Sequence, residues 1–151
     1  MDADTYPDKD VTALINEHFI PVKLHIGKYR DLVEEYEVVW TPTVIVATAD
    51  GAVHHRSVGP LPPREFMAQL AFGIAKADFD RANYAEASKG FREILQQYSA
   101  CDCAPEAMYW LGVSEYKRTG SADAMKAEWR KLLEEYPDSP WAKKVGFIGD
   151  K

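Results

Sequence analysis

The stretch Val38-Val39-Trp40-Thr41-Pro42-Thr43-Val44-Ile45-Val46-Ala47-Thr48 decides the fold of the first half of the chain. Its second part, Thr43–Thr48, is apolar and β-branched, which predicts a buried strand. Asp50-Gly51 follows, and this dipeptide is a strong hairpin turn signal. The chain then returns over Ala52–Val58 as the expected partner strand, and the sequence Gly59-Pro60-Leu61-Pro62-Pro63 ends the pattern. The core of this half is therefore predicted to be a β-hairpin.

Upstream of the hairpin, the pattern predicts a helix, a strand and a second helix. Residues 8–19 have apolar side chains at helical spacing, and Asp8 or Asp10 could cap the first turn. Ile20–Ile26 alternates apolar residues with Pro21, Lys23 and His25, which predicts a strand with one buried face. Tyr29–Tyr36 predicts a short amphipathic helix.

Downstream of Arg64 the sequence predicts helices only. Their apolar residues recur at helical spacing, and the expected spans are about 64–79, 84–98, 104–118, 121–135 and 139–145. The class of structure thus changes near residue 75, from mixed α/β in residues 1–75 to all-α in residues 76–151. No flexible linker marks the change, so the helix from Arg64 is expected to belong to both halves.

Composition bounds the kinds of protein and partner. Hydrophobic residues make up 46% of the 151 residues and the net charge is −6, which is typical of a folded protein and argues against disorder. Basic residues form no stripe, so a nucleic-acid partner is not expected. No apolar run reaches the length of a membrane span. Met1–Asp4 has neither a basic nor an apolar segment, which predicts a cytoplasmic protein if Met1 is the true start.

The order helix, strand, helix, Trp-Thr-Pro-Thr, hairpin, Gly59 and helix resembles the thioredoxin superfamily over residues 1–75. Thr41-Pro42 stands just before the buried strand, where thioredoxins have their cis-proline. The resemblance implies a cis bond there, although a trans proline that simply starts the strand is the alternative. It also implies that Trp40, Thr41 and Pro42 line a surface where an extended substrate segment is held as an added strand.

The same resemblance implies that part of the family's fold lies outside this sequence. In the family, a strand and a helix bearing Cys-x-x-Cys precede the position of Met1, and that strand lies between those corresponding to Ile20–Ile26 and Thr43–Thr48. Three outcomes are open: the two strands pair directly; a segment such as Lys144–Ile148 or a second chain fills the gap; or Met1 is an internal methionine of a longer protein. A homodimer formed by strand exchange belongs to the second outcome.

The second half resembles the tetratricopeptide family. Ile74, Ala75 and Phe79 match Leu111, Gly112 and Tyr116 at a spacing of 37, and Ala87 matches Ala124 at the same spacing. The family repeats with a period of about 34 residues and has small residues where its two helices touch. Trp129 lies one place from the usual aromatic position. Fewer than three repeats do not form a stable stack, so this half must pack on the first half or on a partner.

Two other groups of residues are candidate sites. Cys101 and Cys103 are the only cysteines, and as a redox pair they would form a small strained disulfide. The favoured interpretation is that both are ordinary loop residues, and that Asp102 raises their pKa values. His54 and His55 are expected on opposite faces of one strand, and with His18 and His25 they show no metal-ligand spacing. No metal and no cofactor is expected.

The functional hypothesis is a thioredoxin-like protein of thiol–disulfide oxidoreductase ancestry. Without Cys-x-x-Cys, these 151 residues are not expected to catalyse exchange by the family mechanism. The alternative is a non-catalytic module that holds a protein or peptide partner with the proline-loop edge and the helical tail. Upstream Cys-x-x-Cys would support the first hypothesis, and its absence would support the second.

Overall fold

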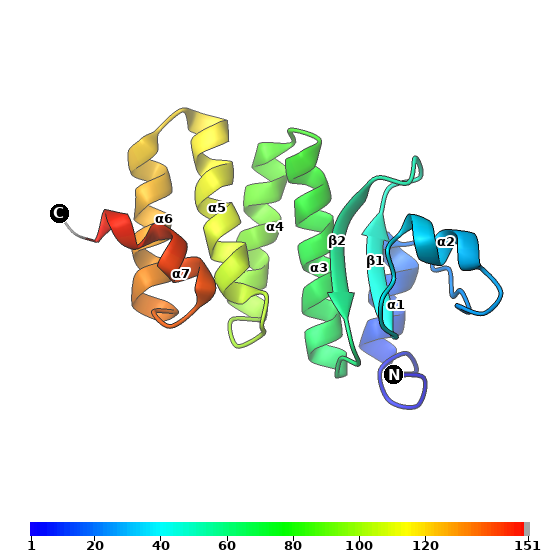
Figure 1. The fold of residues 1–151 in the computed structure, drawn as a ribbon. Coiled ribbons are helices and arrows are strands. Elements are labelled where there is room, and N and C mark those ends of the chain that lie inside the picture. The colour runs from blue at the N-terminus through cyan, green and yellow to red at the C-terminus, as the bar shows by residue number, and fades with distance from the viewer. Residues whose placement is uncertain (150–151) are drawn as a thin grey trace.

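The computed structural model describes residues 1–149. The elements along the chain are α1 (Lys9–His18), α2 (Arg30–Glu35), β1 (Thr43–Ala47), β2 (Val53–Val58), α3 (Pro63–Asp80), α4 (Tyr84–Gln97), α5 (Ala104–Thr119), α6 (Ala122–Glu135), α7 (Pro140–Val145) and a 3₁₀ helix η1 (Gly146–Ile148). Figure 1 shows the helices α3 to α6 side by side, with the hairpin and α1 and α2 at one end and α7 at the other. The α/β half followed by an all-α half is confirmed. Residues 150–151, the end of the expected helical half, lie outside the described residues.

The hairpin is a two-stranded antiparallel sheet with a different helix environment on each face. Val46 on β1 packs in a core with Val11 of α1 and with Phe66 and Leu70 of α3, so these two helices cover one face. On the other face, Arg56 of β2 donates to the backbone carbonyls at the end of α2. The helices thus lie on both sides of the sheet, as in α/β proteins.

Helix α3 is the element that joins the two halves. Its buried residues lie on several sides of the helix (Phe66, Ala68, Leu70, Phe72, Gly73 and Ala75). One side packs on the sheet, where a Cβ at Gly73 would lie 2.6 Å from the Val46 side chain. Another side packs on α4, where Phe72 and Phe91 have ring centroids 5.6 Å apart. A helix that is apolar on most sides belongs in an interior, and α3 lies between the sheet and the helical half.

The helical half consists of the antiparallel hairpins α3–α4 and α5–α6, with small residues at both crossings. A Cβ at Gly90 of α4 would lie 2.9 Å from Ala75, and a Cβ at Gly112 of α5 would lie 2.7 Å from the Trp129 ring. The predicted equivalence of Ala75 and Gly112 therefore has a physical basis, because both lie where two helices approach closely. Helix α7 covers the last hairpin through Ala142 and other apolar residues.

A buried carboxylate links the two helical hairpins. Glu115 of α5 is 6% exposed and accepts from Arg92 of α4 at 2.8 Å and from Arg118 at 2.7 Å. Burial alone would raise the pKa of Glu115, but the hydrogen bonds from Arg118 and Arg92 lower it overall. A buried acid keeps its charge only with such partners, and the Arg92–Glu115 pair joins α4 to α5.

The predicted strand Ile20–Ile26 is wrong. This segment is irregular, and its alternating apolar residues are exposed: Ile20 94%, Val22 71%, Leu24 44% and Ile26 49%. Among residues 1–149 the segment pairs with no strand, because the sheet contains β1 and β2 alone. The alternation is that of a strand, but within residues 1–149 no neighbouring strand supplies a ladder of hydrogen bonds for this segment.

Neither intramolecular way of filling the gap occurs. Within the described part of the chain, Ile20–Ile26 does not pair with β1. The other candidate, Lys144–Ile148, forms the end of α7 and the 3₁₀ helix. Val145 and Ile148 pack there on the core around Leu132, in the helical half. The alternative that this tail fills the gap is thus excluded within residues 1–149, and α7 agrees with the helix expected over 139–145.

Candidate functional site

The loop Val39–Pro42 connects the region after α2 to β1, and it is fixed at its C-terminal side. The Thr43 hydroxyl donates to the Trp40 carbonyl at 2.6 Å, and the Gly59 amide donates to the Pro42 carbonyl at 2.8 Å. The Thr41–Pro42 peptide bond is cis. Gly59 has φ +97°, a conformation that other residues rarely adopt. The loop is thus held in place while the side chain of Trp40 is 67% exposed.

A hollow of about 260 Å³ lies beside Trp40. Apart from Thr41, its walls are hydrophobic: they come from the end of the irregular segment, from α2 and from the loop, and the lining residues are Ile26, Val33, Val38, Val39, Trp40 and Thr41. The Val38 amide donates to the Val33 carbonyl at 2.9 Å, which folds the chain after α2 back against the helix. The hollow can therefore take an apolar side chain of a bound molecule.

Exposed apolar residues concentrate in the segment from Ile20 to Trp40, which also provides most of the lining of the hollow. Seven of the eleven large hydrophobic residues that are exposed among residues 1–149 lie between Ile20 and Trp40. Exposed apolar side chains that gather on a protein surface mark interaction sites more often than isolated ones do.

Strand β1 borders the same region with a free edge. Its one partner among the described residues is β2, and its five residues contain neither a charge nor a proline. Natural proteins usually protect such edges with charges, prolines or a covering element. An unprotected edge next to exposed apolar residues can accept an extended chain as an additional strand.

Two family models match the chain. One, for a thioredoxin-like domain, covers residues 1–74, and the other, for a tetratricopeptide repeat, covers residues 106–139. This chain joins a thioredoxin-like domain to a tetratricopeptide repeat. No curated protein and no solved structure shows significant similarity to it. The first match ends inside α3, and the second spans α5 and α6.

The two cysteines lie outside the thioredoxin-like domain, in the loop between α4 and α5. Both are buried and neither forms a disulfide. Burial, together with the nearby carboxylate of Glu65, raises the pKa of Cys101 to about 11. Burial likewise raises the pKa of Cys103 to about 12. Asp102 adds to the rise at Cys101 as predicted, but burial is the larger cause.

These thiols are expected to react slowly in the folded protein. At pH 8 a thiol with a pKa of about 11 is only about 0.1% thiolate, whereas an ordinary cysteine is about one quarter thiolate. Iodoacetamide should therefore alkylate the native protein about a hundredfold more slowly than the urea-unfolded chain, as read by mass spectrometry. Labelling of either cysteine at the unfolded rate would contradict this burial.

The expected placement of the histidines is wrong. A bulge between Val46 and Ala47 lets His54 and His55 both face α3, although consecutive residues of a regular strand would point to opposite faces. His54 meets Asp80 at 2.8 Å and His55 meets Gln69 at 2.6 Å. His25, which was expected in a sheet, is exposed in the irregular segment.

Thr48, His54 and Asp80 form a chain of polar contacts with the residue types of a catalytic triad, but these contacts join the hairpin to α3. Thr48 contacts His54 at 3.2 Å and donates to Asp50 at 2.5 Å, and Asp80 also binds Lys76 at 2.6 Å. The His54 side chain is only 7% exposed, so a substrate cannot reach it. The network fastens the hairpin to the last turn of α3. In residues 1–149 no group of three or more side chains is placed to hold a metal ion.

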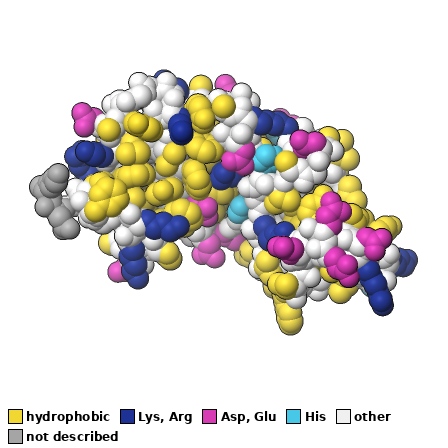
Figure 2. Space-filling view, turned by 45° about the horizontal axis from the view of Figure 1, so that its top comes forward, with side chains coloured by type: hydrophobic (Ala, Val, Ile, Leu, Met, Phe, Trp, Pro, Cys, Tyr) yellow, Lys and Arg dark blue, Asp and Glu magenta, His cyan; other side chains and the backbone are white. Residues whose placement is uncertain are grey.

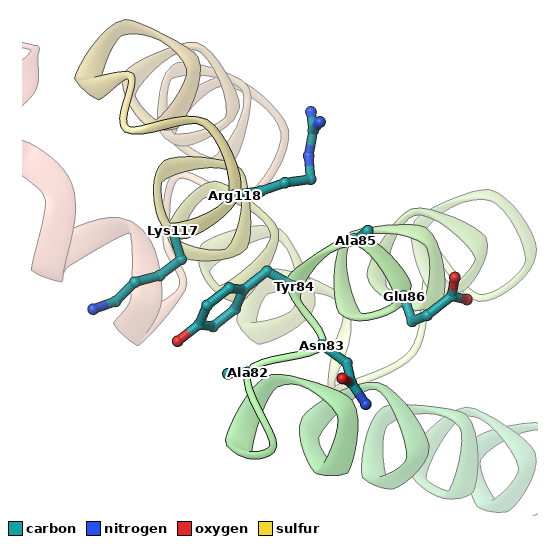
Figure 3. Close-up of a pocket in the computed structure, with 7 residues that line it drawn as sticks. All are labelled: Ala82, Asn83, Tyr84, Ala85, Glu86, Lys117 and Arg118. Carbon is teal, nitrogen blue, oxygen red and sulfur yellow. The ribbon is translucent and has the colours of Figure 1, made fainter.

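A second, shallow hollow of about 400 Å³ lies where the α3–α4 turn meets the end of α5. Figure 3 shows that Tyr84 and Lys117 reach toward the same space, whereas Arg118 and Glu86 point away from it. Arg118 is held by Glu115 at 2.7 Å. The polar groups do not converge on one point, so this hollow offers no clear binding chemistry.

Among the described residues no helix is long and apolar enough to cross a bilayer.

The structure thus brings Trp40, Thr41 and Pro42 together with the free edge of β1, and it separates them from Cys101 and Cys103. The predictions missed the walls of the hollow, above all Ile26 and Val38. The alternating apolar residues of Ile20–Ile26 did single out Ile26. However, the alternation predicted that these side chains are buried in a sheet, whereas the structure exposes them.

Proposed function

We propose that the thioredoxin-like domain binds an extended segment of a partner protein along the free edge of β1. The segment adds as a strand beside β1, and one of its apolar side chains enters the hollow beside Trp40. The observation that carries the proposal is the uncharged, unpaired edge of β1 next to the exposed apolar residues between Ile20 and Trp40.

Main-chain hydrogen bonds supply the affinity in this mode of binding, and pockets for alternate side chains supply the specificity. The position of the Trp40 loop supports such binding, because Thr43 and Gly59 hold its backbone while the indole of Trp40 remains exposed. A fixed loop loses little conformational entropy when a ligand binds. Tetratricopeptide repeats are protein-interaction elements, so the helical half is available to contact a different part of the partner, outside the segment bound by the thioredoxin-like domain.

Thiol–disulfide exchange by these 151 residues is not part of the proposal. The sequence contains no Cys-x-x-Cys, and its two thiols have pKa values raised to about 11 and about 12. The attacking species in exchange is the thiolate, and at neutral pH both cysteines are almost entirely in the protonated thiol form. The relationship to redox proteins therefore rests on the thioredoxin-like fold, and these two cysteines give it no support.

Replacing Trp40 with alanine is expected to weaken peptide binding about tenfold or more, because buried aromatic anchors dominate most interfaces. The probes are three labelled nine-residue peptides in which valine alternates with lysine, glutamine or glutamate. Fluorescence anisotropy gives the dissociation constant of each peptide for the native protein and for Trp40→Ala.

The matched control is Phe147→Ala, because Phe147 is also an exposed aromatic residue, 66% against 67% for Trp40, and lies at the other end of the molecule. It should leave every dissociation constant unchanged. Failure of all three peptides to bind, or an equal loss in both variants, would refute the proposed function.

A further inference from the structure

The net charge of the protein resides in the part that carries the hollow. Ten acidic and four basic residues precede Gly51, which gives −6, whereas the remaining residues contain fourteen of each kind. The whole chain also has a net charge of −6, so everything after Asp50 is neutral overall. A charge confined to one end of an elongated molecule produces a field at that end, which selects partners of the opposite sign.

Several of the acidic residues are sequence neighbours of residues that line the hollow. Glu34 and Glu35 form the last turn of α2, directly after Val33, and Glu37 directly precedes Val38. In the part of the chain that the structure describes, none of these three carboxylates forms an ion pair. Figure 2 shows acidic side chains beside hydrophobic ones on the smaller lobe of the molecule.

The basic residues of this half do not neutralise that rim. Lys23 is held by Asp2 at 2.5 Å. Arg56 on β2 donates to the carbonyls of Tyr36 and Glu37 and is thereby bound to the backbone. Of the other basic residues before Gly51, Lys9 begins α1, whereas Lys28 and Arg30 precede the three unpaired carboxylates in the sequence. The surroundings of the hollow are therefore both apolar and net acidic.

This charge distinguishes between a second copy of the chain and a different partner. The uncharged edge of β1 could pair with itself, but such a dimer would bring together two regions that each carry −6. Juxtaposed like charges cost free energy and slow the encounter of the two molecules. A segment with positive charges avoids this cost and gains from the field.

We infer that the segment bound at the β1 edge is cationic, with apolar side chains for the hollow and lysine or arginine side chains for the carboxylates around it. The inference rests on the proposed function and adds the chemistry of the partner. Since the carboxylates are exposed, their contribution falls with salt, whereas the contribution of the apolar contacts does not.

The ranking of the three peptides tests this inference. At about 25 mM salt the lysine peptide should bind about tenfold or more tightly than the glutamate peptide, with the glutamine peptide between them, and at about 300 mM salt the difference should shrink to about threefold or less. Equal binding of all three, or tighter binding of the glutamate peptide, would overturn the inference while the proposed function stands. Binding by none of them would refute the proposed function itself.

Two matched double variants test whether the carboxylates of α2 are the ones that attract the cationic peptide. Glu34→Gln with Glu35→Gln should weaken the lysine peptide about fivefold at low salt, from two exposed ion pairs of ordinary strength. Glu134→Gln with Glu135→Gln changes the same two-residue sequence at the last turn of α6 and should have no effect. Equal effects of the two pairs, or a dimer in sedimentation that competes with the peptides, would contradict a cationic partner at this edge.

Discussion

Replacing Phe72 with alanine is expected to lower the free energy of unfolding by about 3–5 kcal/mol, which is the usual cost of removing a buried phenylalanine. Phe72 is 1% exposed. Its ring lies 4.7 Å from that of His55 on β2 and 5.6 Å from that of Phe91 on α4. The cavity would thus open in the thioredoxin-like domain and in the helical half together.

The loss should appear in both halves at the same denaturant concentration, because α3 belongs to both. Urea unfolding followed by hydrogen exchange and mass spectrometry reads β1–β2 and α5–α6 separately. Phe147→Ala, at a site that is 66% exposed and whose ring contacts Trp129 at 6.2 Å between centroids, is the control and should cost no more than about 1 kcal/mol. Loss of protection in the sheet alone, with α5–α6 unaffected, would contradict a shared core.

Replacing Gly112 with alanine is expected to cost about 2–3 kcal/mol by overpacking the α5–α6 crossing. The new Cβ would lie 2.7 Å from the Trp129 indole nitrogen and 3.1 Å from the Met125 carbonyl. The indole has little freedom to move, because it donates to the Tyr109 carbonyl at 3.1 Å and stacks on the Tyr109 ring at 5.3 Å. Thermal or urea unfolding measures the change.

Gly146→Ala is the matched control for this substitution. Gly146 has φ −54° and nothing lies within 4 Å of its added Cβ, so alanine fits there without strain. By restricting the unfolded chain it should be neutral or stabilise the protein by up to about 1 kcal/mol. Equal destabilisation by both variants would show that the close approach of Gly112 to Trp129 is not what limits substitution.

The helices and the hairpin could be predicted from the sequence because their signals are local. Asp50-Gly51 fixes the turn between β1 and β2, and apolar residues at helical spacing identify α3 to α6. The small residues Ala75 and Gly112 indicated where pairs of helices touch, since a close helix crossing leaves no room for a larger side chain.

The environment of Ile20–Ile26 could not be predicted in this way. Alternation shows that a segment is suited to a strand, but whether it becomes one depends on a neighbouring strand elsewhere in the chain. The same limit applies to His54 and His55, because a bulge shifts the register by one residue and turns both side chains to α3. The hollow beside Trp40 depends on these nonlocal features, so the sequence indicated Trp40 and Thr41 as binding residues but not Ile26 and Val38.

Hydrogen exchange of the β1 amides with and without the lysine peptide tests the central claim most directly. If the peptide adds as a strand, exchange should slow in Thr43–Ala47, because its backbone groups gain partners, while Ala122–Glu135 stays unchanged. Bound peptide with unchanged exchange in β1, or protection confined to the helical half, would contradict strand addition at this edge.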